Sequence, residues 1–238
     1  MKKFLALMGI LLLLLLAILQ FILPRTVENI LATQITKATA ATEVDVSLSS
    51  SPNFRIALGE IDRSHATASA GYIGDINFKN LTLDAEKVSL DVLELLFPTK
   101  DLSAQLRTQK ILQHADNIQL RGVITQDELK NFIAKQDGKF EDPQVSINKD
   151  EATATAKVKF LGRTVDLDVA GTFLVNNGSI YFHMTRLNSN SILSRVNIDT
   201  FLSDIKILDG AILPLNLKFD SVELREGEAV ITAIGAVQ

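Results

Sequence analysis

The sequence predicts an α+β fold in which an antiparallel sheet carries short amphipathic helices on its apolar inner face. From about residue 44 to the C-terminus, segments with alternating apolar and polar residues recur, as in strands with one buried face. Between them lie a few segments whose apolar residues recur every three or four positions, which is typical of amphipathic helices. Parallel strands, buried on both faces, would be almost continuously apolar, so the alternation favours an antiparallel sheet.

Residues 1–25 predict a membrane anchor. The stretch from Phe4 to Leu23 has no charged residue and one polar side chain, Gln20. Such a helix of about 20 residues spans about 30 Å, the thickness of a bilayer hydrocarbon core. A cleavable signal peptide, the alternative, has a shorter apolar region and small residues at its cleavage site. Two lysines before the span and one arginine after it predict a cytoplasmic N-terminus, with residues 26–238 forming one domain outside the cytoplasmic membrane.

The first half of this domain is predicted to begin with a helix and continue as strands. Thr26 is the expected cap of a helix that runs to about Ala40 with one apolar stripe. A break is expected at Gly71-Tyr-Ile-Gly74, which reads as a turn. Strands are predicted around residues 44–48, 54–58, 76–83, 88–92, 102–106 and 118–120.

The second half is predicted to contain two short helices among further strands. Thr125-Gln-Asp-Glu128 has the pattern of a capping box and should start a helix that ends near Gln136. A second helix is expected over Asn197–Ile207, and the Asn-Gly pair at 177–178 predicts a tight hairpin. Strands are predicted around residues 145–147, 152–160, 164–173, 179–187, 215–219, 222–224 and 230–234, the last hairpin turning at Glu226-Gly227.

Composition argues against several classes of function. The net charge of -4 shows no basic excess, so the chain is not expected to bind a nucleic-acid backbone. There is no cysteine, which excludes disulfides, thiolate metal sites and a cysteine nucleophile. With no Trp and two Tyr, stacking platforms for carbohydrate or single-stranded nucleic acid are scarce.

The sequence predicts neither catalytic residues nor a metal site, and no cofactor. None of the three histidines, His65, His114 and His183, has a second ligand at metal spacing on the same element. Asp166 and Asp168 would lie on one strand face about 7 Å apart, and paired carboxylates can act as acid and base. A solvated strand face opposite apolar residues explains them more simply. No nucleophile elbow, P-loop or dinucleotide fingerprint occurs, so a binding or structural role is expected.

Several ordered motifs resemble one family of bacterial envelope proteins. They comprise the helix entry Leu120–Ile133, then Phe160–Val165, Val169–Phe173, and Ile212-Leu-Pro-Leu215 followed by Val222-Glu-Leu and Gly227, together with the strand pair in Gly71–Val88. In this order they resemble the LmeA-like phospholipid-binding family. Ile212-Leu-Pro-Leu215 departs from the family's ending, because it lacks the second proline.

The resemblance implies a tubular lipid-binding type of fold, in which a strongly curved sheet wraps round a helix and leaves an apolar groove. It also implies membrane phospholipid as the partner, no cofactor, and a role in cell-envelope lipid transport or biogenesis. The residues expected to line the groove are apolar, although each could equally belong to a dry core; they are Leu129, Phe132, Ile133, Val158, Phe160, Val169, Phe173, Phe182, Met184, Phe201, Leu202, Leu215, Leu217 and Phe219.

Three other functions fit parts of the pattern. The same fold with a filled core could serve as an envelope scaffold that recruits protein partners through an exposed apolar patch. Residues 71–92 are also similar to strand pairs of lipid-bridging proteins of the inner-membrane AsmA type. An enzyme acting on lipid would need a clustered acid and base, for which Asp62, Arg63 and His65 are the candidates.

Overall fold

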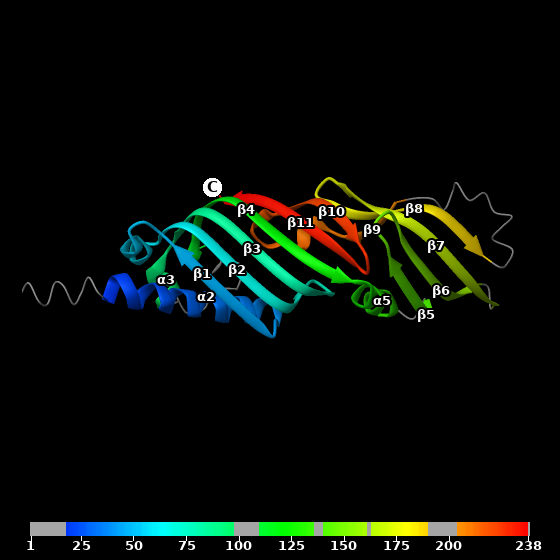
Figure 1. Ribbon diagram of the computed structural model, residues 1–238, viewed down its shortest axis with the longest axis horizontal. Coiled ribbons are helices and arrows are strands. Elements are labelled where there is room, and N and C mark those ends of the chain that lie inside the picture. Colours follow the sequence, from blue (N-terminus) through cyan, green and yellow to red (C-terminus); the bar gives the residue numbers. More distant parts are fainter. Residues whose placement is uncertain (1–17, 98–109, 136–139, 161–162, 190–203, 238) are drawn as a thin grey trace, which may run out of the picture. The chain divides into compact units, whose positions relative to one another are not determined.

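A computed structural model of the chain describes residues 18–97, 110–135, 140–160, 163–189 and 204–237 (Figure 1). Over these residues the protein is mostly β, with a curled antiparallel sheet and a few helices, which confirms the predicted sheet type. One sheet has six strands in the order β1-β2-β3-β4-β11-β10, and the other has five strands, β5 to β9, in chain order.

The strands of the six-stranded sheet are β1 (Glu43–Ser49), β2 (Glu60–Ile73), β3 (Ile76–Leu90), β4 (Leu112–Thr125), β10 (Lys218–Arg225) and β11 (Glu228–Val237). Those of the five-stranded sheet are β5 (Phe140–Ile147), β6 (Ala152–Phe160), β7 (Arg163–Asn176), β8 (Ser179–Ser189) and β9 (Ile205–Leu208). The α-helices are α2 (Leu23–Thr39), α3 (Val92–Leu96) and α5 (Gln126–Ala134). A π-helical turn, η1 (Ile18–Ile22), and three 3₁₀ turns, η2 (Asn53–Leu58), η5 (Gly210–Ile212) and η6 (Pro214–Asn216), complete the elements.

The chain forms two compact units. Unit 1 comprises Met1–Ala68, Thr82–Gln119 and Gly235–Gln238, and unit 2 comprises Ser69–Leu81 and Leu120–Ile234.

In unit 1, α2 lies beneath the curl of the sheet, against β1 (Figure 1). Val27 is fully buried, and the Leu48 backbone N–H donates to the Glu28 carboxylate at 2.9 Å, which ties helix to strand. The prediction that Thr26 caps this helix is wrong. Proline suits the first turn of a helix, where its missing N–H is not needed, and with Pro24 there the helix begins at Leu23. The Thr26 hydroxyl instead donates to the Ile22 carbonyl at 3.1 Å, within the first turn.

The predicted strand over residues 54–58 is also wrong, because this segment is the 3₁₀ turn η2. Arg55 N–H donates to the Pro52 carbonyl at 3.1 Å, and Gly59 N–H donates to the Ile56 carbonyl at 3.0 Å. Gly59 then ends the turn with a φ of 83°. A 3₁₀ turn has about three residues per turn, so residues two apart do not share one face as they would in a strand. Ile56 is therefore buried, while Phe54 and Leu58 are exposed.

Strand β2 lies where the sequence showed no strand pattern. Its buried positions are mostly alanine and glycine (Ala66, Ala68 and Gly71), whose small side chains give a weak hydrophobic alternation. The expected turn is therefore confined to Gly74 and Asp75, and Gly71 lies inside the strand. Likewise the strand predicted over 88–92 ends at Leu90, because the Asp91 carboxylate accepts the Glu94 N–H at 2.9 Å and caps α3.

In unit 2, two local predictions are confirmed. The Thr125 hydroxyl accepts the Glu128 N–H at 3.3 Å and caps α5, although the helix ends at Ala134 rather than near Gln136. Asn177 and Gly178 have φ values of 49° and 73°, so β7 and β8 are joined by a tight turn of the mirror-image type.

Two further predictions in unit 2 need correction. Ile205 and Ile207, expected on a helix, lie in strand β9, which pairs with β8; the rest of that predicted helix, residues 197–203, falls outside the described residues. The last hairpin turns at Glu226-Gly227 as predicted, but its first strand starts at Lys218. Leu215 belongs to the turn η6, with a φ of 59°.

None of the described helices is long and apolar enough to span a membrane. The predicted span Phe4–Leu23 lies largely in residues 1–17, outside the described residues, as does the strand predicted over 102–106.

Candidate functional site

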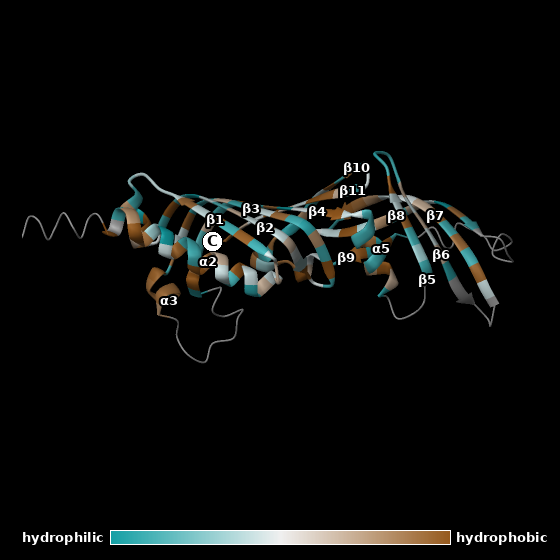
Figure 2. Ribbon diagram, turned by 60° about the horizontal axis from the view of Figure 1, so that its bottom comes forward, coloured by the Kyte–Doolittle hydropathy of each residue, from teal (hydrophilic) through white to brown (hydrophobic). Residues whose placement is uncertain are grey.

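One face of the β5–β9 sheet is apolar over its whole width. Residues paired across neighbouring antiparallel strands point to the same side of a sheet. The register sets Ala154 opposite Val169 and Val169 opposite Leu187, and it sets Phe173 opposite Phe182 and Phe182 opposite Ile205. Figure 2 shows the alternation of hydrophobic and hydrophilic residues along these strands.

The opposite face of the same sheet is polar. Glu141, Lys157 and Asp166 are paired across β5, β6 and β7, and Thr172 is paired with His183 across β7 and β8. A sheet with one apolar and one charged face must cover the apolar face with something other than water.

At one end of the apolar face, the elements that cover it leave an apolar cavity. Strand β10 packs against β7 and β8, and α5 packs against β5. Between them lies a cavity of about 20 Å³, room for one water molecule. Its lining is entirely apolar and belongs to unit 2: Ile76, Ile124, Leu129, Ile147, Phe173, Ile180, Ile207, Leu208, Val222, Ala229 and Ile231.

Backbone hydrogen bonds hold the two layers around the cavity together. At the β10–β11 turn, Gln126 N–H donates to the Gly227 carbonyl at 3.0 Å, and Gly227 N–H donates to the Ile147 carbonyl at 2.8 Å. At the β7–β8 turn, Phe219 N–H donates to the Gly178 carbonyl at 3.2 Å. The end of the apolar face that carries the cavity is therefore fixed from two sides.

Beyond the cavity, several residues of the apolar face are only half-buried, although Met184 and Val165 on the same face are buried. Phe173 lines the cavity, while Phe182, Val169, Leu187 and Ala154 continue the face away from it and keep part of their surface in solvent. Half-buried apolar residues that continue from an apolar cavity form a strip on which an alkyl chain could lie.

The predicted groove residues fall into four groups. Leu129 and Phe173 meet at the cavity. Val169, Phe182 and the buried Met184 lie on the same sheet face as Phe173. Leu217 and Phe219 are buried, Phe132, Ile133 and Leu215 are half-buried, and none of these five lines the cavity. The backbones of Val158 and Phe160 lie on β6 in phase with Ala154, but their side chains, like Phe201 and Leu202, fall outside the described residues.

Most of the cavity lining was not among the predicted groove residues. Ile76, Ile124 and Ile231 come from strands of the six-stranded sheet, and Ile147 and Ile180 come from the five-stranded one. Each stands at an apolar position of an alternating segment, so the pattern marks them as inward-facing. It does not say which strands lie across from each other, and that pairing decides which inward residues share a cavity.

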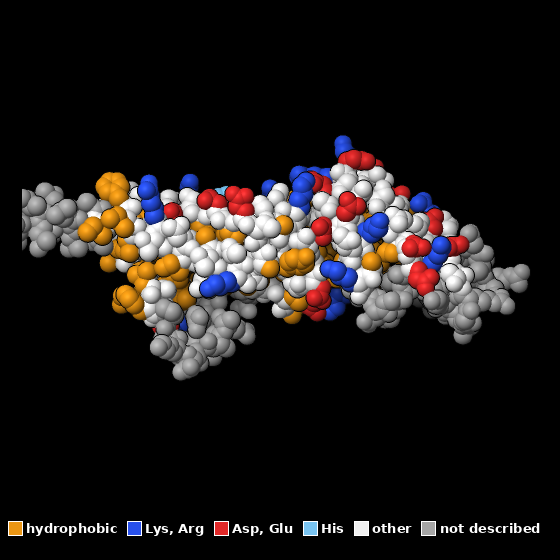
Figure 3. Space-filling model, turned by 90° about the horizontal axis from the view of Figure 1, so that it is seen from below, with side chains coloured by type: hydrophobic (Ala, Val, Ile, Leu, Met, Phe, Trp, Pro, Cys, Tyr) orange, Lys and Arg blue, Asp and Glu red, His pale blue; other side chains and the backbone are white. Residues whose placement is uncertain are grey.

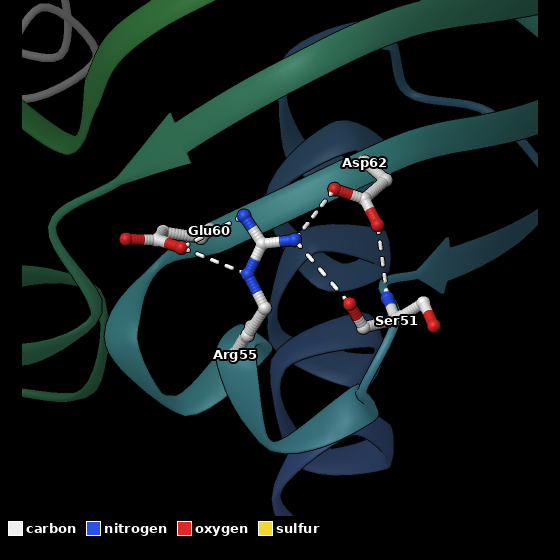
Figure 4. A network of polar contacts seen from close by, with 4 residues as sticks. All are labelled: Ser51, Arg55, Glu60 and Asp62. Carbon is white, nitrogen blue, oxygen red and sulfur yellow. Dashed lines mark hydrogen bonds and ion pairs between the residues drawn. The ribbon is translucent and has the colours of Figure 1, made fainter.

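The residues considered for acid–base chemistry are engaged elsewhere. Asp62 accepts the Ser51 backbone N–H at 2.9 Å and lies 3.0 Å from Arg55, which also pairs with Glu60 at 2.9 Å (Figure 4). The hydrogen bond from Ser51 and the charge of Arg55 hold the pKa of Asp62 below its ordinary value. His65 pairs with Asp84 at 2.7 Å. The described contacts therefore do not join Asp62 to His65.

The remaining histidine and aspartate candidates pair at exposed positions. His183 contacts Asp204 at 2.8 Å on the polar face, and Asp168 accepts a hydrogen bond from Asn188 at 3.3 Å. Within the residues that the structure describes, no three His, Asp or Glu side chains gather as metal ligands.

Comparison with known proteins bears on this site. A sequence model of the family described as LmeA-like phospholipid-binding matches residues 18–234. No curated protein and no solved structure matches the chain. The family match covers both sheets and every residue that lines the cavity. This chain belongs to the LmeA-like phospholipid-binding family.

Proposed function

We propose that the protein binds phospholipid by laying acyl chains along the half-buried apolar face of the β5–β9 sheet, with no catalytic step. The family supports lipid binding. The observation that carries the location is the strip of Phe182, Val169, Leu187 and Ala154, which continues from the cavity and remains partly exposed.

The size of the cavity decides where a chain would lie. At about 20 Å³ it holds one water molecule at most, so an acyl chain cannot be enclosed there. The chain would instead cover the strip beyond Phe173, with the cavity beside its end. Each methylene buried contributes about 0.8 kcal/mol, so ten methylenes on the strip would contribute about 8 kcal/mol.

Such a site would recognise the chain more than the head group. The residues of the strip and the cavity lining are apolar, so they offer no hydrogen bond to a phosphate or an alcohol. A head group would stay in water at the margin of the sheet.

We further propose that the protein works at the extracytoplasmic side of the cytoplasmic membrane, in envelope lipid transport or biogenesis. The support is the uncharged stretch Phe4–Leu23, preceded by Lys2 and Lys3 and followed by Arg25. An anchored domain would stand next to its lipid supply.

A second candidate is a non-enzymatic envelope scaffold with a filled core. The small volume of the cavity favours it, because a packed interior leaves little room for a ligand. In this case the half-buried strip would be the rim of an ordinary core or would contact a protein partner.

Native mass spectrometry of the purified full-length chain separates the two candidates. The protein is extracted in detergent, and the detergent is stripped in the gas phase. Lipid binding predicts a defined phospholipid adduct that survives the removal of detergent, whereas the scaffold predicts the bare mass. Recovery of only the bare mass after expression in several bacterial hosts would overturn the lipid-binding proposal.

A further inference from the structure

A second apolar surface lies in unit 1 and shares no residue with the proposed lipid site. We name it the docking patch and define it by its most exposed large side chains. Phe97, Leu93, Phe21 and Leu58 are 76%, 72%, 69% and 69% exposed. Ile22 and Phe54 complete it. Figure 3 shows hydrophobic side chains gathered at this end of the described chain.

The patch is assembled from three short elements that pack round the start of α2. Turn η1 contacts both α2 and η2, and α2 contacts both η2 and α3. Side chains from residues 21–22, 54–58 and 93–97, distant in sequence, therefore stand on neighbouring elements of one unit. Scattered apolar side chains need no explanation, but a group on neighbouring elements does.

Fixed contacts hold the η2 part of the patch outward. Arg55, between Phe54 and Leu58 in the sequence, binds Glu60 and Asp62, and Asp62 binds the Ser51 backbone (Figure 4). Behind it, a Cβ on Gly59 would stand 1.9 Å from the Leu90 carbonyl oxygen, so only glycine allows η2 to lie this close to β3.

The α3 part is fixed in a similar way. Asp91 caps the helix through the Glu94 N–H at 2.9 Å, and its own N–H donates to the Ile111 carbonyl at 2.8 Å. Both elements therefore have a set conformation in which Leu58, Leu93 and Phe97 point away from the core. Large apolar side chains held in water by a rigid scaffold indicate a contact surface.

We propose that the docking patch inserts into a bilayer leaflet at the boundary between head groups and acyl chains. The described chain begins at Ile18, in the turn η1 that carries Phe21 and Ile22, and the residues that precede it from Phe4 carry no charge. An occupant of the patch must be compatible with that adjoining apolar stretch. A leaflet is compatible with it, because Phe and Leu side chains settle at the boundary between head groups and acyl chains.

This inference deepens the proposed function, since it rests on the chain being at the membrane, but its residues lie outside the proposed lipid site. The anchor would hold the chain to the membrane, and the docking patch would seat unit 1 on the leaflet surface.

The absence of cysteine allows a direct test with the full-length chain. A single cysteine is introduced as Leu93→Cys or, at a second site, Leu58→Cys, and labelled with an environment-sensitive fluorophore. Thr67→Cys, an exposed position on β2 in the same unit, is the matched control. Each protein is placed in nanodiscs of phosphatidylcholine and phosphatidylglycerol, where both membrane sides are open to solvent.

At Leu93 and Leu58 we expect blue-shifted emission that lipids carrying a nitroxide quench severalfold more than aqueous iodide does. At Thr67 the order of the quenchers should reverse. Equal iodide quenching at all three sites would overturn the docking proposal. Protection from both quenchers would overturn it too, in favour of a protein partner or a second copy. The phospholipid adduct measured on the same samples reports on the proposed lipid site independently.

Discussion

The rings of Phe173 and Phe182 pack edge to face across β7 and β8, with centroids 5.5 Å apart and planes inclined by 61°. Phe173 lines the apolar cavity, and Phe182 stands directly opposite it in the strand register, where the face opens to solvent. Such aromatic pairs contribute about 0.5–1.5 kcal/mol beyond the area that they bury. The pair therefore joins the cavity lining to the half-buried strip on the apolar face.

A charge on the half-buried strip should abolish lipid binding without unfolding the protein. Val169→Glu places a carboxylate where the proposal lays an acyl chain, and desolvating that carboxylate would cost several kcal/mol. Because Val169 is half-buried, the side chain can turn toward water when no lipid is bound. We expect the phospholipid adduct to fall at least tenfold by native mass spectrometry.

The matched control is Thr172→Glu, on the same strand but on the polar face opposite His183. It adds the same charge and should leave the adduct unchanged. Equal losses in the two variants would show that the effect is one of net charge or stability and not of the strip.

Gly171→Ala should destabilise the five-stranded sheet. An added Cβ would stand 2.2 Å from the His183 carbonyl oxygen and 2.7 Å from the Phe182 ring, beside the irregularity in register at Ala170. Because one of these atoms belongs to the backbone, a side-chain rotation cannot relieve the clash. We expect the free energy of unfolding to fall by about 1–3 kcal/mol in urea titrations. Gly227→Asn, in an open turn that asparagine tolerates, should change it by a few tenths.

Removal of the Thr125 hydroxyl should weaken α5. Thr125→Ala leaves the Glu128 N–H without its acceptor, which typically costs about 0.5–2 kcal/mol. Since Leu129 follows directly and lines the cavity, the loss should appear in global unfolding and not only as local fraying. Thr125→Ser keeps the acceptor and should recover most of the stability. If serine were as damaging as alanine, packing of the threonine methyl would be the cause instead.

The Arg55–Asp62 contact predicts a specific acid sensitivity. The hydrogen bond from Ser51 and the charge of Arg55 lower the pKa of Asp62 below 3.8 in the folded protein. A group whose folded pKa is depressed stabilises the fold above its unfolded pKa, and this contribution disappears as the pH falls through the folded value. Asp62→Asn should therefore be less stable than the wild type at pH 7, with the difference shrinking below pH 3.8.

Thermal unfolding monitored by circular dichroism at several pH values measures that difference. Asp220→Asn, which removes an exposed carboxylate on β10, is the control and should follow the wild type throughout. A difference between Asp62→Asn and the wild type that is constant with pH would contradict the electrostatic origin.

The sequence predicts the elements best where the local pattern and the packing agree. The described side chains of β5 and β6 alternate broadly in phase with their burial, and the Asn177-Gly178 turn and the Thr125 cap each need particular residues at particular positions. These signals are local, so one sequence contains them. Strand β2 was missed because most of its inward residues are too small to mark a hydrophobic face. The turn η2 was mistaken for a strand because Phe54, Ile56 and Leu58 have the spacing of a strand although the backbone turns.

The site could be predicted only in part, for a different reason. Leu129 and Phe173 were expected to face inward and do meet at the cavity. The isoleucines from the six-stranded sheet join them because β10 packs against β7 and β8, a contact between segments that no local pattern encodes. The docking patch was also invisible, since Phe54 and Leu58 look like core residues until the turn exposes them.

The most direct test of the central claim is photo-crosslinking of the full-length protein in liposomes that contain a phospholipid with a diazirine near the end of its acyl chain. Tryptic peptides that gain lipid mass locate the chain. We expect crosslinks on β7 and β8, around Val169, Phe182 and Leu187, and their loss in Val169→Glu but not in Thr172→Glu. Crosslinks confined to residues 1–40 in all three proteins would contradict the claim, because acyl chains would then meet the chain only where it touches the bilayer.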